Sequence, residues 1–476
     1  MQHPGLSDAP PDHIIYVWRG GKIFPNNVMA QPDMGRDIQA ASGSLLISLP
    51  QQRVEQTGRR AHELAAELYP LCRSLTGEGV RGTLRRLQEL IPLTINEIPS
   101  GTPAYDWVVP DEWNITDAYV LDGAGRRVID FNASNLHVVG YSSPIDARVS
   151  REELLRHLHT DPDHPDWIPY RHTYYRESWG FCAAHRLLAE LTEAEYRVRI
   201  DSRIAPGSLS YGELYLPGTE PGEILVSTHI CHPSLGNDNL SGIVIAALLA
   251  QDLQLAPRRF GVRFLFVPAT LGPIVWLSRN EPVAAAVLAG LVLAGVGDDG
   301  APTYMRSRRG NALIDRAIEH VFRHYSPAAK IRDFAPTGYD QRQYCSPGFD
   351  LPVGGFMRTP NGQYAQYHTS ADNLKFVTPG ALGDSWRLIR MTLDIVQENL
   401  RFENLSPKGE PRLGPRGLFN DAERLGLLWL LSLSDGRHTL LDIAERSGLP
   451  FWHLLEGARQ LEQSGLLRRM SERDAE

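Results

Sequence analysis

The sequence predicts an α/β fold in which a largely parallel central sheet is covered by helices on both faces. Three apolar runs, at residues 224–226, 262–267 and 288–296, have the composition of buried strands. Helical stretches follow the first two runs, at 243–253 and from about residue 273. Such alternation is typical of parallel sheets, whose strands lie between layers of helices.

The chain is too long for one small core, and its composition changes along its length. At 476 residues, about two to four domains are expected. Prolines punctuate the first 55 residues, short alternating runs rich in Trp and Tyr begin near residue 97, and three helical segments with short turns close the chain. We predict an N-terminal appendage at 1–55, an α/β domain at 56–96 and 216–405, an inserted β-rich domain at 97–215, and a winged helix-turn-helix at 415–476.

The net charge limits the partners that we expect, and the cysteine content limits the expected location. A net charge of -8 argues against a protein that coats nucleic acid or an anionic membrane. The four cysteines are scattered and form no CxxC pair, so we expect a reducing, cytoplasmic location. No signal-like start and no run of membrane-spanning length is found, so no membrane insertion is expected.

The C-terminal segment has a poor surface for DNA. Its candidate recognition helix carries Trp452, Leu454, Leu455 and Glu456, and its one basic residue is Arg459. We therefore predict a docking or dimerisation module, and homo-oligomers formed through this module or through the β-rich insert.

A polar loop between the strand at 224–226 and the following helix is the main candidate site. It holds His229, His232 and Asp238, and open α/β sheets place their sites in such loops. Imidazole and carboxylate groups are zinc ligands. In the alternative interpretation, the histidines bond loop backbone while Asp238 or Asn239 caps the next helix. A distant segment around His368 has the same combination of polar residues and favours the metal site.

Residues 160–175 suggest a second metal site less strongly. They include His164 and His172 together with three aspartates. Their spacing is irregular and prolines interrupt them, so a solvent-facing loop is the favoured interpretation.

Four short motifs stand out along the chain. They are His229-Ile230-Cys231-His232-Pro233, Asn237-Asp238-Asn239-Leu240-Ser241-Gly242, Gln343-Tyr344-Cys345-Ser346-Pro347-Gly348 and Tyr367-His368-Thr369-Ser370. Together they resemble a bacterial family of aminopeptidase-like proteins of the DUF4910/DUF2172 type, and the resemblance covers about residues 60–470. In that family a zinc-peptidase fold like that of the M28 aminopeptidases carries a small β insert and a C-terminal winged helix.

The resemblance implies a set of site residues. His229, Asp238 and His368 would hold zinc, as one or two ions, with Asp238 able to bridge two of them. His232, Asp298 and Asp372 would be further ligands or would orient the ligands, and Asp340 would orient a histidine or contact the substrate.

One position departs from the family pattern. The family reads Pro-Glu-Thr-Ile-Gly after the second apolar strand, whereas this chain reads Pro268-Ala269-Thr270-Leu271-Gly272. The missing glutamate is the residue that takes a proton from water in M28-like peptidases, and general acid–base help is worth ~10²–10⁴-fold. The chain is therefore a disabled variant, a member with a different base, or a non-catalytic descendant.

The resulting hypothesis is a zinc-dependent amide or peptide hydrolase of aminopeptidase type, acting on a small peptide or an amidated amino acid. Tyr344 would stabilise the oxyanion. Arg306, Arg308 and Arg309 would bind a substrate carboxylate, unless they form a solvated basic turn. The alternatives are a zinc-dependent acyl transferase or cyclase on the same fold, and a non-catalytic metal-binding scaffold. A DNA-binding regulator is the weakest option.

Overall fold

The computed structural model describes residues 16–19, 22–25, 49–418 and 421–470. The chain divides into two units, residues 1–47 and 48–476. In the first unit, β1 (Tyr16–Arg19) and β2 (Lys22–Pro25) form an antiparallel hairpin. The expected appendage at 1–55 extends too far, because a helix of the second unit already begins at Gln51.

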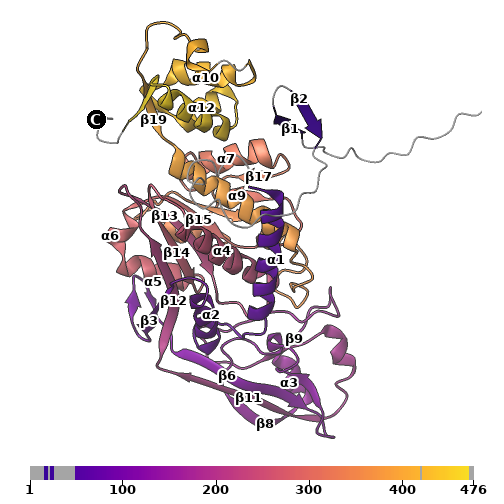
Figure 1. The fold of residues 1–476 in the computed structure, drawn as a ribbon. Helices are drawn as coiled ribbons and strands as arrows, with labels where there is room; N and C mark the ends of the chain where they lie inside the picture. The colour runs from indigo at the N-terminus through magenta and orange to yellow at the C-terminus, as the bar shows by residue number, and fades with distance from the viewer. Residues whose placement is uncertain (1–15, 20–21, 26–48, 419–420, 471–476) are drawn as a thin grey trace, which may run out of the picture. The chain divides into compact units, whose positions relative to one another are not determined.

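A central sheet of eight strands organises the second unit (Figure 1). Its middle strands β14, β13, β15 and β18 are parallel, which confirms the predicted α/β class. Antiparallel pairs flank them, β12 and β3 on one side and β16 on the other, and β17 then pairs parallel to β16. In spatial order the strands are β17 (Lys330–Arg332), β16 (Thr303–Met305), β18 (Val353–Met357), β15 (Val287–Leu293), β13 (Glu223–His229), β14 (Gly261–Val267), β12 (Ser208–Leu216) and β3 (Thr94–Pro99).

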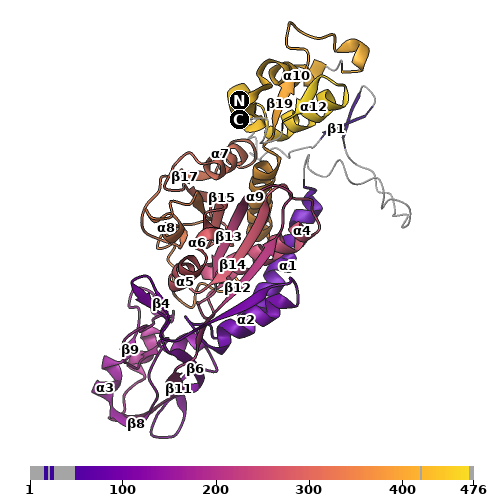
Figure 2. The same cartoon turned by 90° about the vertical axis from the view of Figure 1, so that its left-hand side faces the viewer.

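Helices cover both faces of this sheet, with α1, α2 and α4 on one face and α5, α6 and α8 on the other (Figure 2). The close approach of α1 to α9 depends on glycine, because a Cβ at Gly58 would lie 2.0 Å from the Pro379 carbonyl oxygen. Helix α9 begins with Pro379 at its first position and with the Thr378 side chain accepting from the Ala381 N–H. The helices are α1 (Gln51–Leu68), α2 (Glu78–Gln88), α4 (Gly242–Gln254), α5 (Leu271–Arg279), α6 (Glu281–Ala284), α7 (Leu313–Tyr325), α8 (Gln341–Tyr344) and α9 (Pro379–Glu398).

The inserted domain is built on an antiparallel sheet in the order β7-β6-β11-β8. It is shorter than the predicted 97–215, because β3 and β12 at its two ends belong to the central sheet. Neither strand is a continuous apolar run like those of the parallel strands, so the sequence pattern did not separate them from the insert. Its elements are β4 (Pro103–Ala104), β5 (Trp107–Val108), β6 (Glu112–Leu121), β7 (Arg127–Asp130), β8 (Ile145–Ser150), α3 (Arg151–Arg156), β9 (Leu158–His159), β10 (Phe181–Cys182) and β11 (Glu195–Ala205).

The C-terminal part is a winged helix, as predicted, but it starts earlier than residue 415. Strand β19 joins the three-stranded sheet β20-β19-β21, so the domain begins at Arg401. Helix α11 starts with a capping box, in which Thr439 and Asp442 bond each other's backbone N–H groups. The elements are β19 (Arg401–Asn404), α10 (Asp421–Leu433), β20 (Asp435–Thr439), α11 (Leu440–Ser447), α12 (Phe451–Gln463) and β21 (Leu467–Arg469).

Polar contacts join the winged helix to α7 of the α/β domain. Arg316 binds Asp442 and Glu445, each at 2.6 Å. His320 is 1% exposed, and its Nε2 accepts a hydrogen bond of 3.0 Å from the Phe451 N–H at the start of α12. Among the helices of the described residues, none has both the length and the apolar composition needed to cross a membrane.

The His320 contact predicts a pH-dependent stability. Burial, aided by His324 and Arg323, lowers the pKa of His320 from 6.5 to about 3, so its Nε2 stays an acceptor. The folded chain keeps this histidine neutral while the unfolded chain protonates it below pH 6.5. This contribution is therefore complete above pH 6.5 and is lost as the pH falls toward 3. Between pH 7 and pH 5 we expect a loss of about 1–2 kcal/mol in unfolding free energy.

Urea unfolding at both pH values measures this loss. His320→Gln retains an oxygen acceptor that does not titrate in this range, so its unfolding free energy should fall less between pH 7 and pH 5. An identical pH dependence in the two proteins would contradict the assignment.

Candidate metal centre

The candidate residues gather at the carboxyl ends of the parallel strands. His229 is the last residue of β13, and the irregular segment Gly236–Ser241 follows before α4 begins. Ala269 follows β14, and Asp298 follows β15. Since these strands are parallel and adjacent, the loops after them share one edge of the sheet, where open α/β folds place their ligand sites.

Asp238 lies between two histidines that are far apart in the sequence. Its Oδ1 is 2.9 Å from His229 Nε2, and its Oδ2 is 2.9 Å from His368 Nε2. The side chain is 1% exposed. Burial alone would raise the pKa of Asp238, but its hydrogen bonds to His229 and His368 outweigh this effect and hold this pKa well below its usual range. Asp238 is therefore a buried carboxylate anion surrounded by imidazoles.

His232 adds a third imidazole to the cluster. Ligand atoms of His229, His232 and Asp238 all lie within 4.8 Å of one another. His232 Nδ1 is buried and has no hydrogen-bond partner among the described residues. Burial lowers the pKa of His232 well below its usual value, so the ring is neutral and a ring nitrogen can offer a lone pair. The structure thus brings together all four residues predicted from the two histidine segments.

Two further carboxylates hold the loop that carries Asp238. Asp372 accepts from the backbone N–H groups of Asn237, at 2.5 Å, and Asp238, at 2.9 Å. Burial raises the pKa of Asp372 to about 7. Asp298 accepts from the Asn237 side chain at 2.9 Å, from Thr359 and from the Gly300 N–H. Both residues therefore position the loop and do not themselves join the histidine cluster.

The capping alternative does not describe this loop. The Asn239 amide donates to Thr228 Oγ1 at 2.8 Å, and its oxygen accepts from the Gly295 N–H at 3.1 Å. It therefore ties the loop to β13 and to the residues after β15, and Asp238 faces the histidines.

Aromatic rings enclose the cluster, and the sequence analysis did not single them out as site residues. Tyr339 stacks on His229 with ring centroids 5.7 Å apart, and Tyr367 stacks on His368 at 4.0 Å. Tyr170 lies edge-on to His232 and His368, and its N–H donates to the His368 carbonyl at 2.7 Å. Tyr170 belongs to the stretch 160–175, so the inserted domain supplies one wall of the centre.

The stretch 160–175 therefore differs in part from the predicted solvent-facing loop. Its first half does form a local group, in which His164 pairs with Asp161 at 2.8 Å and stacks on Trp167. Its second half reaches the centre, where burial lowers the pKa of His172 to about 4 and the ring stacks on Tyr174. The many aromatic residues in this stretch are the sequence feature that could have indicated its partly buried position at the centre.

Ala269 lies next to the loop of the first histidines. Its N–H donates to Cys231 Sγ at 3.2 Å, which places residue 269 between the ends of β14 and β13. Its methyl group offers no proton acceptor.

Asp340 is a buried carboxylate near the cluster. It is 1% exposed, both of its oxygens lack hydrogen-bond donors among the described residues, and burial raises its pKa to about 6 against the opposing charges of His229 and Arg342.

The structure does not bring Tyr344 or the three arginines to the cluster. Tyr344 is fully buried beside Trp276, and its hydroxyl shares a 2.8 Å hydrogen bond with Ser227. It is thus occupied within the core, which argues against the predicted oxyanion role. Each arginine is already ion-paired: Arg306 binds Glu319 and Asp333, and Arg308 and Arg309 both bind Asp350.

Comparison with known families identifies the α/β unit and its insert. A family model described as "Domain of unknown function (DUF4910)" matches residues 62–399. The chain belongs to the DUF4910 family. A second model, described as a winged helix-turn-helix, matches residues 401–469 and agrees with the domain start at β19 in this DUF4910 protein.

Similar proteins share the family's architecture. A Clostridium acetobutylicum protein, provisionally named a polysaccharide biosynthesis protein with an aminopeptidase-like domain, is 43% identical over 425 residues, which are 88% of this chain and 98% of that protein. A crystal structure of a provisionally assigned peptidase from the same organism has a TM-score of 0.86 at 43% identity, covering 88% of this chain and 98% of that one.

More distant structures show the fold alone. A zinc aminopeptidase from Bacillus subtilis has a TM-score of 0.53 at 11% identity and covers 71% of this chain and 95% of its own. An M28 peptidase precursor from Shewanella amazonensis has a TM-score of 0.50 at 12% identity and covers 73% of this chain and 96% of its own. The DUF4910 chain therefore has the fold of the M28 peptidases.

The role of Asp298 can be tested with its neighbour as the control. Asp298→Asn replaces one acceptor oxygen by an NH₂ group that faces N–H donors, so we expect a loss of about 1–3 kcal/mol in unfolding free energy. Asp299 is exposed and accepts a hydrogen bond from Thr378 Oγ1. Asp299→Asn should change the unfolding free energy little. Equal losses in the two variants, measured by urea unfolding, would contradict the role of Asp298 in holding the loop.

Proposed function

We propose that this DUF4910 protein is a zinc-dependent amide hydrolase of the aminopeptidase type, acting on a small peptide or an amidated amino acid, and that Ala269 limits its rate. The observation that carries the proposal is the buried Asp238 carboxylate between His229 and His368 at the carboxyl ends of the central strands.

The donor set suits zinc. The site offers the nitrogens of three imidazoles and the oxygens of one carboxylate, which are the atoms that zinc prefers outside thiolate sites. His232 supports the assignment, because its Nδ1 is a buried polar atom without a partner among the described residues, and such atoms call for a ligand. Zinc, when bound, supplies Lewis acidity that activates an amide carbonyl and water.

Asp340 is the proposed contact for the substrate's amino group. Its two oxygens have no donor within the described chain, and a buried carboxylate without donors is costly unless a cation or hydrogen-bond donor joins it. A protonated amino group is both a cation and a hydrogen-bond donor. Tyr339, its neighbour, lies on His229, so this contact would hold the adjacent amide bond beside the histidine cluster.

Ala269 sets the expected rate. The position lies beside Cys231 on the loop that carries His232, yet its methyl group cannot take a proton from water. We therefore infer that binding of metal and substrate persists while proton transfer is impaired.

The winged helix is the proposed docking module. The N-terminus of α12, the helix that winged proteins place in the DNA groove, lies on His320 of α7. Seven of its residues are buried and are therefore not available to a nucleic acid: Phe451, Trp452, Leu454, Leu455, Gly457, Ala458 and Leu461.

Metal content tests the ligand set directly. We expect elemental analysis of the purified chain to find zinc, and His229→Ala and His368→Ala to lose most of it, because each variant removes an imidazole that would bind the zinc together with Asp238. His164→Ala is the matched control, since that histidine pairs with Asp161 in the local group. Retention of zinc in both ligand variants would contradict the proposal.

Restoring the carboxylate tests the chemistry. We expect Ala269→Glu to raise kcat/KM on a panel of aminoacyl amides and dipeptides by ~10²–10⁴-fold. Ala269→Gln has nearly the same size without a base, so it should stay at the wild-type rate. Product masses must gain one water; products without that gain would indicate the transferase or cyclase. No activity in the zinc-loaded glutamate variant would favour a non-catalytic scaffold.

A further inference from the structure

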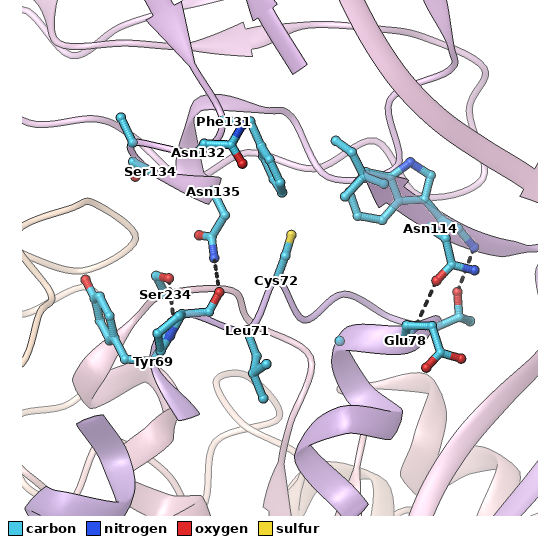
Figure 3. Close-up of a pocket in the computed structure, with 16 residues that line it drawn as sticks. Tyr69, Leu71, Cys72, Glu78, Asn114, Phe131, Asn132, Ser134, Asn135 and Ser234 are labelled. Carbon is cyan, nitrogen blue, oxygen red and sulfur yellow. Dashed lines mark hydrogen bonds between the residues drawn. The ribbon is translucent and has the colours of Figure 1, made fainter. Parts of the chain in front are cut away.

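A cavity lies where the connection between α1 and α2 meets the inserted domain (Figure 3). Its volume is about 610 Å³, within the range of small-molecule sites. Leu71 and Cys72 line it from the connection, while Ile115, Phe131 and Asn135 line it from the insert. None of the roles assigned above involves this cavity.

The lining is polar but almost without charge. Glu78 is the one charged side chain among its lining residues, and it is already paired with Arg81 at 2.6 Å and with Arg85 at 3.1 Å. No Lys, Arg or His lines the space, so a phosphate or carboxylate would find no counter-charge there. The electrostatics therefore favour an uncharged ligand.

The Asn135 amide is incompletely satisfied. Its Nδ2 donates to the Pro70 carbonyl over a long 3.3 Å, and its Oδ1 is buried without any donor among the described residues. Buried acceptors are nearly always paired, so this oxygen calls for a donor that the described residues do not supply. Asn132 and Ser134 add further amide and hydroxyl groups to the same wall. Ligand hydroxyls, which both donate and accept, match such a wall.

Apolar side chains line the same cavity. Phe131 is half-buried and its ring projects into the space in Figure 3. Ile115 also lines the cavity and is partly buried. A ligand with hydroxyls around its edge and C–H groups on its face would satisfy both surfaces. We propose that this cavity binds an uncharged sugar residue, with its C–H face on Phe131 and its hydroxyls at Asn135 and Asn132.

The cavity and the metal centre share the His232 loop. Ser234 lines the cavity, and its Oγ donates to the Tyr69 carbonyl at 2.7 Å. Arg73, from the same connection, donates to the His232 carbonyl at 2.8 Å and to the Leu68 carbonyl at 2.6 Å. A sugar in this cavity therefore lies against the backbone that places His232. The proposal does not depend on hydrolysis at the metal centre.

Binding of free sugars to the full chain tests the proposal. The probes are methyl glycosides of glucose, galactose and N-acetylglucosamine, with glucose 6-phosphate as the anionic comparison. We expect at least one neutral glycoside to bind in the millimolar range, and the phosphate to bind about tenfold more weakly or not at all. Cys72 gives a local readout, since it is partly exposed in the cavity while the other three cysteines are buried. A bound sugar should slow its alkylation, followed by mass spectrometry.

Two variants locate the site. Phe131→Leu and Asn135→Leu should each weaken glycoside binding by about tenfold or more, because they remove the ring face and the amide. Phe349→Leu is the matched control: it is also a partly buried phenylalanine on the same core, but it contacts Tyr105 and lies outside this cavity. It should bind as the wild type does.

Several results would overturn the proposal. These are no glycoside binding at tens of millimolar, no protection of Cys72 by a glycoside that binds, equal binding of the sugar phosphate, or protection by a short neutral peptide and by no sugar. If a variant fails to fold, the Cys72 protection in the wild-type chain still decides between these outcomes.

Discussion

A buried negative charge at Asp238 is the constraint on which this structure depends. A carboxylate at 1% exposure carries a desolvation cost of several kcal/mol, which is offset only where cations or hydrogen-bond donors surround it. Here His229 comes from the end of a central strand, and His368 comes from a loop 130 residues beyond Asp238. The neutral His232 beside them has a buried ring nitrogen without a partner among the described residues, which can bind a divalent cation together with Asp238.

The inserted domain is part of this arrangement. It leaves and re-enters the central sheet through β3 and β12, which pair with each other at the edge of the sheet. From there its chain returns over the centre, where Tyr170 bonds the backbone of His368 and Ser370 bonds Ile168. The position of His368 thus depends on the insert as well as on its own loop. The inserted domain and the winged helix differ in what they contact. The insert contacts the metal centre, whereas the winged helix contacts α7 and α9.

The parts of this structure that follow from local pattern could be predicted, and the parts that follow from long-range contacts could not. Buried parallel strands give continuous apolar runs, so the core strands and the loop with His229 and Asp238 were accessible from sequence. Strands β3 and β19 lack such a run, so the predicted boundaries cut through β3 and placed β19 in the α/β domain. Tyr344 seemed available for chemistry because nothing in its own segment indicates that Ser227, 117 residues earlier, takes its hydroxyl. Tyr170 was missed for the same reason.

Residue 269 shows how far the geometry of the centre and its chemistry are separable. The loop with Asp238 is held by Asp298 and Asp372, through Asn237 and backbone N–H groups, and none of these contacts involves the loop after β14. That loop touches the centre through Cys231, using the backbone of Ala269 and not its side chain. A glutamate and an alanine at this position therefore fit the same main-chain contact. The ligand cluster can therefore persist unchanged when the proton acceptor is lost. The cluster supports metal binding, whereas catalytic turnover also requires a proton acceptor, which Ala269 does not provide.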